Sequence, residues 1–305
     1  MAKLGFLGLG IMGGPMALNL INAGHEVALW SHSAGKADQL AAKAAKGATA
    51  CKTPAEVAKR SDFVFLCVGN TEMSREVILG KNGLAEGGAS GLVIADCSTI
   101  SPSASRRIGT ELATRGIQFL DSPCTGSKGG AETGTLTFMI GGDPEVFART
   151  RPYFEIMGKL LYYCGAAGMG LQAKLSQNMI QGNLLQAFNE SLVLSTKGGV
   201  DPNLMLEILS NTGAQSALVS AKAPFVFARD FSTKFSVKWL EKDMELMLES
   251  AAELNVPLPV TALSRQLYWT AIAKGLGEDD ICGSIRVLED IAGCEVVAPA
   301  KPAAK

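Results

Sequence analysis

The chain has 305 residues, 47% of them hydrophobic and 19% charged, and its formal net charge is −1. That length suffices for two domains, each with a core of its own. Because the net charge is close to zero, nothing attracts nucleic acid or an anionic membrane over a distance, and we expect neither as a partner. Without any apolar run of about eighteen residues, the sequence also predicts no membrane-spanning helix.

The numbers of cysteines and histidines argue against several kinds of site. Seven cysteines, with no pair at Cys-x-x-Cys spacing, are typical of reduced thiols, so we expect a cytoplasmic protein. Only two histidines are present, His25 and His32. A His/Cys metal site and a Ser-His-Asp triad are therefore poorly supported, and we expect no bound metal.

The N-terminal segment has the pattern of a dinucleotide-binding turn. The apolar run 3–8 predicts a buried strand, and residues 16–22 predict a helix that ends at Gly24. The glycines between them have Gly-x-Gly-x-x-Gly spacing, in which the first makes a tight turn, the second admits a pyrophosphate and the third lets helix and strand pack closely. We expect cofactor contacts from Gly8, Gly10, Ile11, Met12 and Gly13.

The end of the second predicted strand, 26–30, bears on the choice of cofactor. NAD-binding domains usually place an acidic residue here to hold the ribose 2′-hydroxyl, whereas this chain has Ser31, His32, Ser33 and Lys36. Hydroxyls, an imidazole and a lysine suit a 2′-phosphate better, so NADP is favoured. NAD stays possible, because the arginine that normally forks around that phosphate is missing.

Further strands are predicted at 63–68, 92–97, 117–121, 136–140 and 160–163, with helical patterns between the earlier ones. This alternation predicts an α/β fold, a doubly wound Rossmann sheet whose later, closely spaced strands form a mixed edge. Val68 ends the third predicted strand and Gly69 follows it, at the carboxyl edge of the sheet that faces the cofactor.

The segment Asp121–Ala131 is rich in small residues. Such residues expose backbone N–H groups, which form a concavity suited to a carboxylate, and Thr125 and Ser127 add hydroxyl donors. The alternative is a flexible surface loop, because Gly/Ser clusters are common in loops.

The second half of the chain predicts helices only. Lys174 and Asn178 lie four residues apart near the start of a helix over 171–197, so they share one face, which is either functional or simply solvated. A helix of that length spans about 40 Å, which suggests an interface with another subunit, and we expect a homodimer or homotetramer. Further helices are expected at 203–210, 239–251, 260–274 and 278–292.

The sequence predicts two domains and a tail. Residues 1–165 form a dinucleotide-binding domain, and residues 166–296 form an all-α substrate and dimerisation domain. Residues 297–305 are expected to be a disordered tail.

From Lys3 to about Ala292 the chain resembles the β-hydroxyacid dehydrogenase family. This family includes 3-hydroxyisobutyrate dehydrogenase and glyoxylate/succinic semialdehyde reductase. The motifs of the chain are most similar to those of the glyoxylate/succinic semialdehyde reductase branch. Four separated motifs in the family order carry the resemblance. They are the glycine turn from Gly8 to Met16, the loop from Asp121 to Ala131, the stretch from Gly168 to Asn178, and Phe235–Asp243.

The resemblance implies an NAD(P)-dependent oxidoreductase that transfers hydride between nicotinamide and a small hydroxyacid or an aldehyde or keto acid. By position in the motifs, Lys174 matches the catalytic lysine and Asn178 the neighbouring asparagine, and Thr125 and Gly126 match the pair that binds the substrate carboxylate. The remaining matches are pocket residues Phe235 and Asp243 and cofactor contacts Thr99 and Lys242. Thr125 stands where serine is usual, and Ser31–Ser33 stands where Asn-Arg-Ser/Thr is common in NADP-dependent members.

Two other functions fit the same fold. Imine reductases and reductive aminases resemble it but commonly replace the catalytic lysine, so Lys174 argues for at most a side activity of that kind. A non-catalytic nucleotide-binding protein would tend to lose the lysine and to add reader domains, and this chain does neither.

Overall fold

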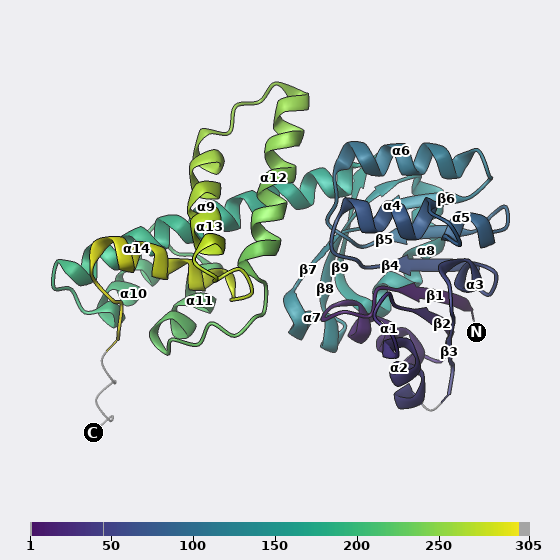
Figure 1. Cartoon of the computed structure of the whole chain (residues 1–305), viewed down its shortest axis with the longest axis horizontal. Coiled ribbons are helices and arrows are strands. Elements are labelled where there is room, and N and C mark those ends of the chain that lie inside the picture. Colours follow the sequence, from purple (N-terminus) through teal and green to yellow (C-terminus); the bar gives the residue numbers. More distant parts are fainter. Residues whose placement is uncertain (1, 45, 299–305) are drawn as a thin grey trace. The chain divides into compact units, whose positions relative to one another are not determined.

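The computed structural model describes residues 2–44 and 46–298. Contacts between residues divide it into two compact units, of which the first ends at Leu175 and the second begins at Ser176 (Figure 1). Among the described residues, no helix combines the length and the apolar character that crossing a membrane requires. The predicted disordered tail lies outside the described residues from position 299 onward.

The first unit is built on one mixed sheet with strand order β3-β2-β1-β4-β5-β6-β8-β7, in which β9 also pairs with β8. Strands β1 to β6 are parallel, and the edge is mixed, since β8 runs antiparallel to β6 while β9 runs parallel to β8. Chain order reverses between β1 and β4, the point at which such sheets bind ligands. The strands are β1 (Lys3–Leu7), β2 (Glu26–Trp30), β3 (Ala48–Ala50), β4 (Phe63–Leu66), β5 (Val93–Asp96), β6 (Gln118–Asp121), β7 (Cys124–Thr125), β8 (Leu136–Gly142) and β9 (Gly158–Gly165).

Alternation along the strands directs side chains to two cores, one on each face of the sheet. Phe65 of β4 joins one core, and its neighbours Val64 and Leu66 join the other. The helices that contribute to the first core are α1 (Gly13–Asn22), α2 (Lys36–Ala44), α7 (Ser127–Thr133) and α8 (Pro144–Met157). Those that contribute to the second are α3 (Pro54–Ala58), α4 (Thr71–Leu79), α5 (Leu84–Gly87), α6 (Pro102–Ala113) and, through Leu171, the start of α9 (Met169–Lys197).

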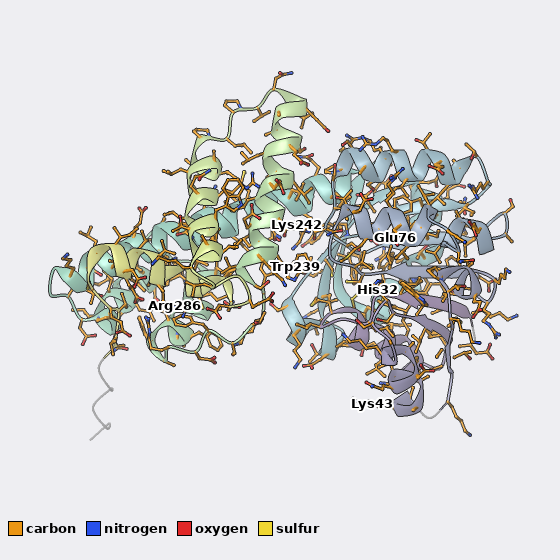
Figure 2. All side chains as sticks on the ribbon, viewed as in Figure 1. His32, Lys43, Glu76, Trp239, Lys242 and Arg286 are labelled. Atoms are coloured by element: carbon orange, nitrogen blue, oxygen red, sulfur yellow. The ribbon has the colours of Figure 1, made fainter. Side chains whose placement is uncertain are left out.

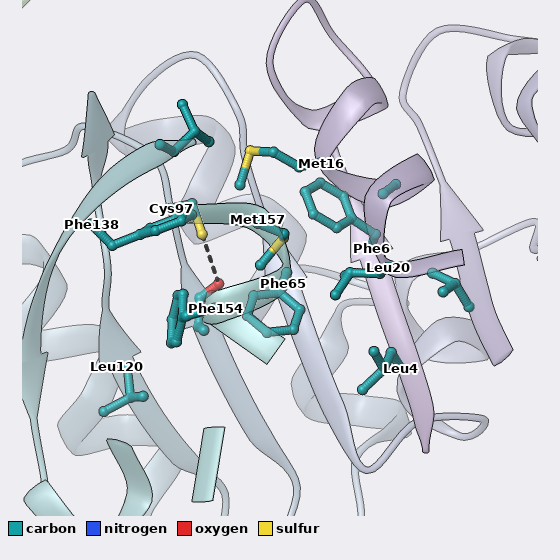
Figure 3. Close-up of a cluster of buried hydrophobic side chains, with 14 of the residues drawn as sticks. Leu4, Phe6, Met16, Leu20, Phe65, Cys97, Leu120, Phe138, Phe154 and Met157 are labelled. Carbon is teal, nitrogen blue, oxygen red and sulfur yellow. Dashed lines mark hydrogen bonds between the residues drawn. The ribbon is translucent and has the colours of Figure 1, made fainter. Parts of the chain in front are cut away.

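The first core is rich in aromatic side chains (Figure 3). Phe154 of α8 meets Phe65 edge-on at 5.3 Å between ring centroids and Phe138 at 5.0 Å. Such pairs contribute about 0.5–1.5 kcal/mol beyond their buried area. These contacts hold α8 firmly against β4 and β8, so the strands that end at the carboxyl edge of the sheet are well supported.

The second unit consists of helices. Its elements are α9 (Met169–Lys197, whose first residues belong to the first unit), α10 (Pro202–Ser210), α11 (Ala217–Phe227), α12 (Val237–Leu254), α13 (Pro259–Ala273), a 3₁₀ turn η1 (Ile281–Ser284) and α14 (Ile285–Ala292). The doubly wound sheet followed by helices confirms the predicted fold class.

Two details of the helical half differ from the sequence prediction. Helix α11 was not predicted, and the helix expected over 278–292 is α-helical only from Ile285. The side chain of Asp280 accepts a hydrogen bond from the Cys282 N–H and starts the 3₁₀ turn, which delays the α-helix.

Candidate functional site

The three glycines of the N-terminal turn have three different surroundings. A Cβ on Gly8, whose φ is +86°, would lie 2.0 Å from the Cys67 carbonyl oxygen, and one on Gly13 would lie 1.9 Å from that of Gly8. A Cβ on Gly10 would meet nothing within 4 Å. Gly8 and Gly13 thus hold the backbone together, whereas Gly10 leaves open space against which a ligand can lie.

The start of α1 is suited to a phosphate. Within the described part of the chain, no side chain caps this helix, and its first turn holds no acidic residue. Its N–H groups and the positive end of its dipole therefore remain available to an anion. Ile11, next to Gly10, is 54% exposed. These residues fit the diphosphate of a dinucleotide.

Hydrogen bonds join the loop after β1 to the end of β2, and the loop after β4 to the loop after β5. The Gly8 N–H donates to the Trp30 carbonyl at 3.1 Å. The Val68 N–H donates to Ser98 Oγ at 2.8 Å, and the Ser98 N–H donates to Asp96 Oδ1 at 2.9 Å. The structure therefore brings Val68, Gly69 and Thr99 to the same edge of the sheet as the glycine turn.

The residues after β2 lie beside that edge. His32 is exposed (Figure 2). Ser33 and Lys36 are exposed too, and Lys36 is the first residue of α2. Ser31 is half-buried. These donors are accessible to a group bound at the end of β2.

The Gly/Ser-rich segment after β6 is ordered. Cys124 and Thr125 form β7 and pair with β8, and α7 begins two residues later at Ser127. Gly126 has φ +134° and Ser127 has φ +57°. A non-glycine residue in the left-handed region is uncommon, and such strained residues cluster at functional sites, although Asn82, Arg229 and Asn255 also adopt this region.

Lys174 lies close to this segment. Its side chain is buried, with 6% of its surface exposed, in the second turn of α9. Burial raises the pKa of the Cys124 thiol to about 11, and the Lys174 ammonium acts on it in the opposite direction. That electrostatic effect places the lysine near the loop that carries Thr125.

Asp121, to which the sequence motifs gave no role, connects the segment that carries Thr125 to the start of the helix that carries Lys174. Its Oδ1 accepts a hydrogen bond from the Gly168 N–H at 2.6 Å, and its Oδ2 accepts one from the Leu171 N–H at 2.9 Å. The sequence signal was present, since an acidic residue ends a buried strand directly before a glycine-rich segment.

The second unit holds another set of predicted site residues. Asn178 and Asp243 are 1% and 2% exposed, and the Asn178 side-chain nitrogen donates to Asp243 Oδ2 at 2.6 Å. Lys242 Nζ lies 2.8 Å from Asp243 Oδ1 and 5.9 Å from the ring centroid of Trp239 (Figure 2). Trp239 was not predicted, although its spacing of three from Lys242 places both on one face of α12.

The remaining predicted residue, Phe235, precedes α12 and is half-buried. Its N–H donates to Asp280 Oδ2 at 3.1 Å, and Asp280 Oδ1 lies 2.6 Å from Lys222 Nζ. Although burial raises the pKa of Asp280, Lys222 outweighs it and holds that pKa below its ordinary value. An ionised carboxylate therefore fixes the backbone at Phe235.

Two family models match the chain. The NAD-binding domain of 6-phosphogluconate dehydrogenase matches residues 3–165, and a model described as NAD-binding of NADP-dependent 3-hydroxyisobutyrate dehydrogenase matches residues 168–288. The chain is 37% identical to 2-(hydroxymethyl)glutarate dehydrogenase of Eubacterium barkeri over 96% of its own length and 97% of that protein. The chain belongs to the β-hydroxyacid dehydrogenase family.

Other members show the same relationship. Chloroplastic glyoxylate/succinic semialdehyde reductase 2 of Arabidopsis thaliana is 36% identical over 94% of this chain and 79% of that protein. The structure of Mycobacterium tuberculosis 3-hydroxyisobutyrate dehydrogenase with L-serine has a TM-score of 0.85 at 28% identity, covering 94% of this chain and 99% of that one. This member of the β-hydroxyacid dehydrogenase family is an NAD(P)-dependent oxidoreductase.

Proposed function

We propose that this chain interconverts a small hydroxyacid and the corresponding aldehyde or keto acid, with NADP as the preferred cofactor and Lys174 as general acid and base. The observation that carries the proposal is a buried lysine beside a loop suited to a carboxylate. Dehydrogenases and reductases for such acids are among its relatives.

The residues divide the reaction between them. A bound nicotinamide supplies the carbon that gives or accepts hydride. Lys174 donates a proton to the carbonyl oxygen during reduction and, as the neutral amine, accepts it during oxidation. Thr125, Gly126 and Ser127 bind the carboxylate and so orient the reacting carbon.

Asn178 has a defined orientation, which supports a role at the substrate. The Asp243 carboxylate only accepts hydrogen bonds, so the amide nitrogen of Asn178 must face it. The amide oxygen then points elsewhere, and among the described residues it has no hydrogen-bond partner. It is therefore available to accept a hydrogen bond from the substrate hydroxyl. By their positions in the family motif, Phe235 and Asp243 are assigned to substrate binding and Lys242 to cofactor binding.

For the cofactor, the glycine turn with Ile11 and Met12 would hold the diphosphate, and Val68, Gly69 and Thr99 would make further contacts from the same edge of the sheet. Ser31, His32, Ser33 and Lys36 supply hydrogen bonds and positive charge to a 2′-phosphate, which favours NADP over NAD.

The proposal also covers the domain organisation, the oligomeric state and the cellular location of the protein. Residues 1–165 form the dinucleotide-binding domain, and 166–296 form the substrate and dimerisation domain. Exposed Ile180, Leu194 and Leu263 on the helical unit support a homodimer or homotetramer. Seven cysteines without a disulfide in the described residues support a cytoplasmic location.

A substrate panel with both cofactors tests the proposal. We expect turnover of at least one of glyoxylate, succinic semialdehyde, tartronate semialdehyde and 3-hydroxyisobutyrate, faster with NADP(H) than with NAD(H). Butyraldehyde, which lacks the carboxylate of succinic semialdehyde, provides the matched control and should react at least about tenfold more slowly. No turnover of any acid with either cofactor would overturn the proposal.

A further inference from the structure

Asp121 connects the substrate loop to the first turn of the helix that carries Lys174. It is the last residue of β6, and the segment with Thr125 leaves the sheet directly after it. Its two carboxylate oxygens accept hydrogen bonds from Gly168 and Leu171, which are 47 and 50 residues further along the chain. Lys174 follows Leu171 by three residues, which is less than one helical turn.

The carboxylate has almost no freedom to move. Asp121 is 1% exposed. A Cβ on Gly141 would lie 2.7 Å from its Oδ1, and a Cβ on Gly170 would lie 2.9 Å from its Oδ2. Strand β8 and helix α9 therefore approach the carboxylate with glycines, and any larger residue there would displace it.

The placement also has an electrostatic consequence. A carboxylate at a helix N-terminus offsets the positive end of the dipole. A Cβ on Gly170 would face this carboxylate, and Lys174 follows Gly170 by four residues, so Lys174 lies on the same face of α9. Charged or titratable groups near the carboxylate among the described residues include Asp96 on β5, Cys164 on β9 and Arg106 on α6, which lies against Gly168.

We propose that Asp121 is the positioning residue for Lys174. By holding the first turn of α9 with both oxygens, it fixes the ammonium relative to the loop at Thr125, and its negative charge stabilises the ammonium form. The inference rests on the proposed role of Lys174 in proton transfer. It assigns Asp121 no contact with the substrate.

Asp121→Asn tests the inference, because the amide keeps the shape and one acceptor but loses the charge and the second acceptor. We expect kcat to fall about 10- to 100-fold, because a small misplacement of a catalytic group lowers the rate by about that much. The Kd for NADPH should stay within about twofold, and the limb of the pH–kcat profile that reports the lysine should move to lower pH. Asp143→Asn is the matched control, since Asp143 accepts hydrogen bonds from Glu145 and Val146 at the start of α8, which carries no proposed site residue.

A double-mutant cycle separates this inference from the proposed function. In a Lys174→Ala background, Asp121→Asn should reduce kcat no further, because the group it positions is gone. If Lys174→Ala keeps its kcat, the proposed role of Lys174 as general acid and base fails. If Lys174→Ala is impaired but Asp121→Asn keeps both its kcat and its pH profile, only the inference about Asp121 fails. Asp121→Ser is a second variant of smaller size, and failure of both to fold would also contradict the inference, since Asp121 would then serve the fold.

Discussion

The side-chain nitrogen of Asn178 lies 2.6 Å from Asp243 Oδ2, and both residues are buried. A hydrogen bond to a buried charge contributes about twice as much as one between neutral groups. We therefore expect Asn178→Ala to lower the free energy of unfolding by about 2–3 kcal/mol. The matched control on the same helix is Asn183→Ala, which removes a neutral bond to Thr261 Oγ1.

For that control we expect a loss of about 1 kcal/mol. Urea unfolding at neutral pH measures both values. Equal losses of unfolding free energy in the two variants would show that the hydrogen bond from Asn178 to the Asp243 carboxylate is no stronger than a neutral one.

Lys36 and Lys43 provide a matched pair for the cofactor. Both are on α2, Lys36 as its first residue and Lys43 in its last turn. If Lys36 binds the 2′-phosphate, Lys36→Ala should raise the KM for NADPH about tenfold, equivalent to about 1.4 kcal/mol, and leave the KM for NADH unchanged. Lys43→Ala should change neither KM. An equal rise for NADPH and NADH in the Lys36 variant would argue against 2′-phosphate recognition.

Gly10 and Gly13 separate nucleotide binding from folding. Gly10→Ala places its methyl group in open space, so the melting temperature should change little while the Kd for NADPH rises at least about tenfold. Gly13→Ala places a methyl group 1.9 Å from a carbonyl oxygen, so it should destabilise the protein by several kcal/mol. Thermal melts and cofactor titrations of both variants test this. Unchanged affinity in Gly10→Ala would remove Gly10 from the cofactor site.

The buried Asp96 should make the stability of the fold depend on pH. Burial raises its pKa from 3.8 to about 6. Because the folded-state pKa is the higher one, ionisation destabilises the fold, and this loss grows as the pH rises from about 4 to about 6. Asp96→Asn should therefore be more stable than the unmodified protein at about pH 7.5, by at most about 3 kcal/mol, with the advantage vanishing near pH 4.

Urea unfolding at several pH values measures that difference. Asp38→Asn, at an exposed position of α2, controls for the loss of one negative charge. An advantage that does not vary with pH would contradict the assignment to Asp96.

Local patterns predicted the first half of the fold well. The glycine turn, the apolar strands and the mixed edge are visible from sequence because strand period, glycine spacing and chain order are local properties. Helices α7 and α11 were missed. Four of the seven residues of α7 are Gly, Ser or Thr, which favour loops, and Pro224 lies inside α11.

The site was predictable only where motifs supplied the residues. Lys174 and Asn178 share a helix, so spacing related them directly. Asp121 acts through hydrogen bonds to residues 47 and 50 positions away, and no periodicity encodes such tertiary contacts. Trp239, by contrast, lies three residues before Lys242 on α12, so helical spacing could have indicated it.

The central claim is that Lys174 transfers the proton, and the kcat of Lys174→Ala with the best substrate of the panel tests it most directly. Lys197 at the other end of α9 is the only other lysine of that helix, so Lys197→Ala is the matched control. Loss of a general acid costs about 10²- to 10⁴-fold in rate. We predict a loss of that size for Lys174→Ala with the Kd for NADPH within about twofold, and a kcat within about twofold for Lys197→Ala. A folded, NADPH-binding Lys174→Ala enzyme that keeps most of its kcat would contradict the claim.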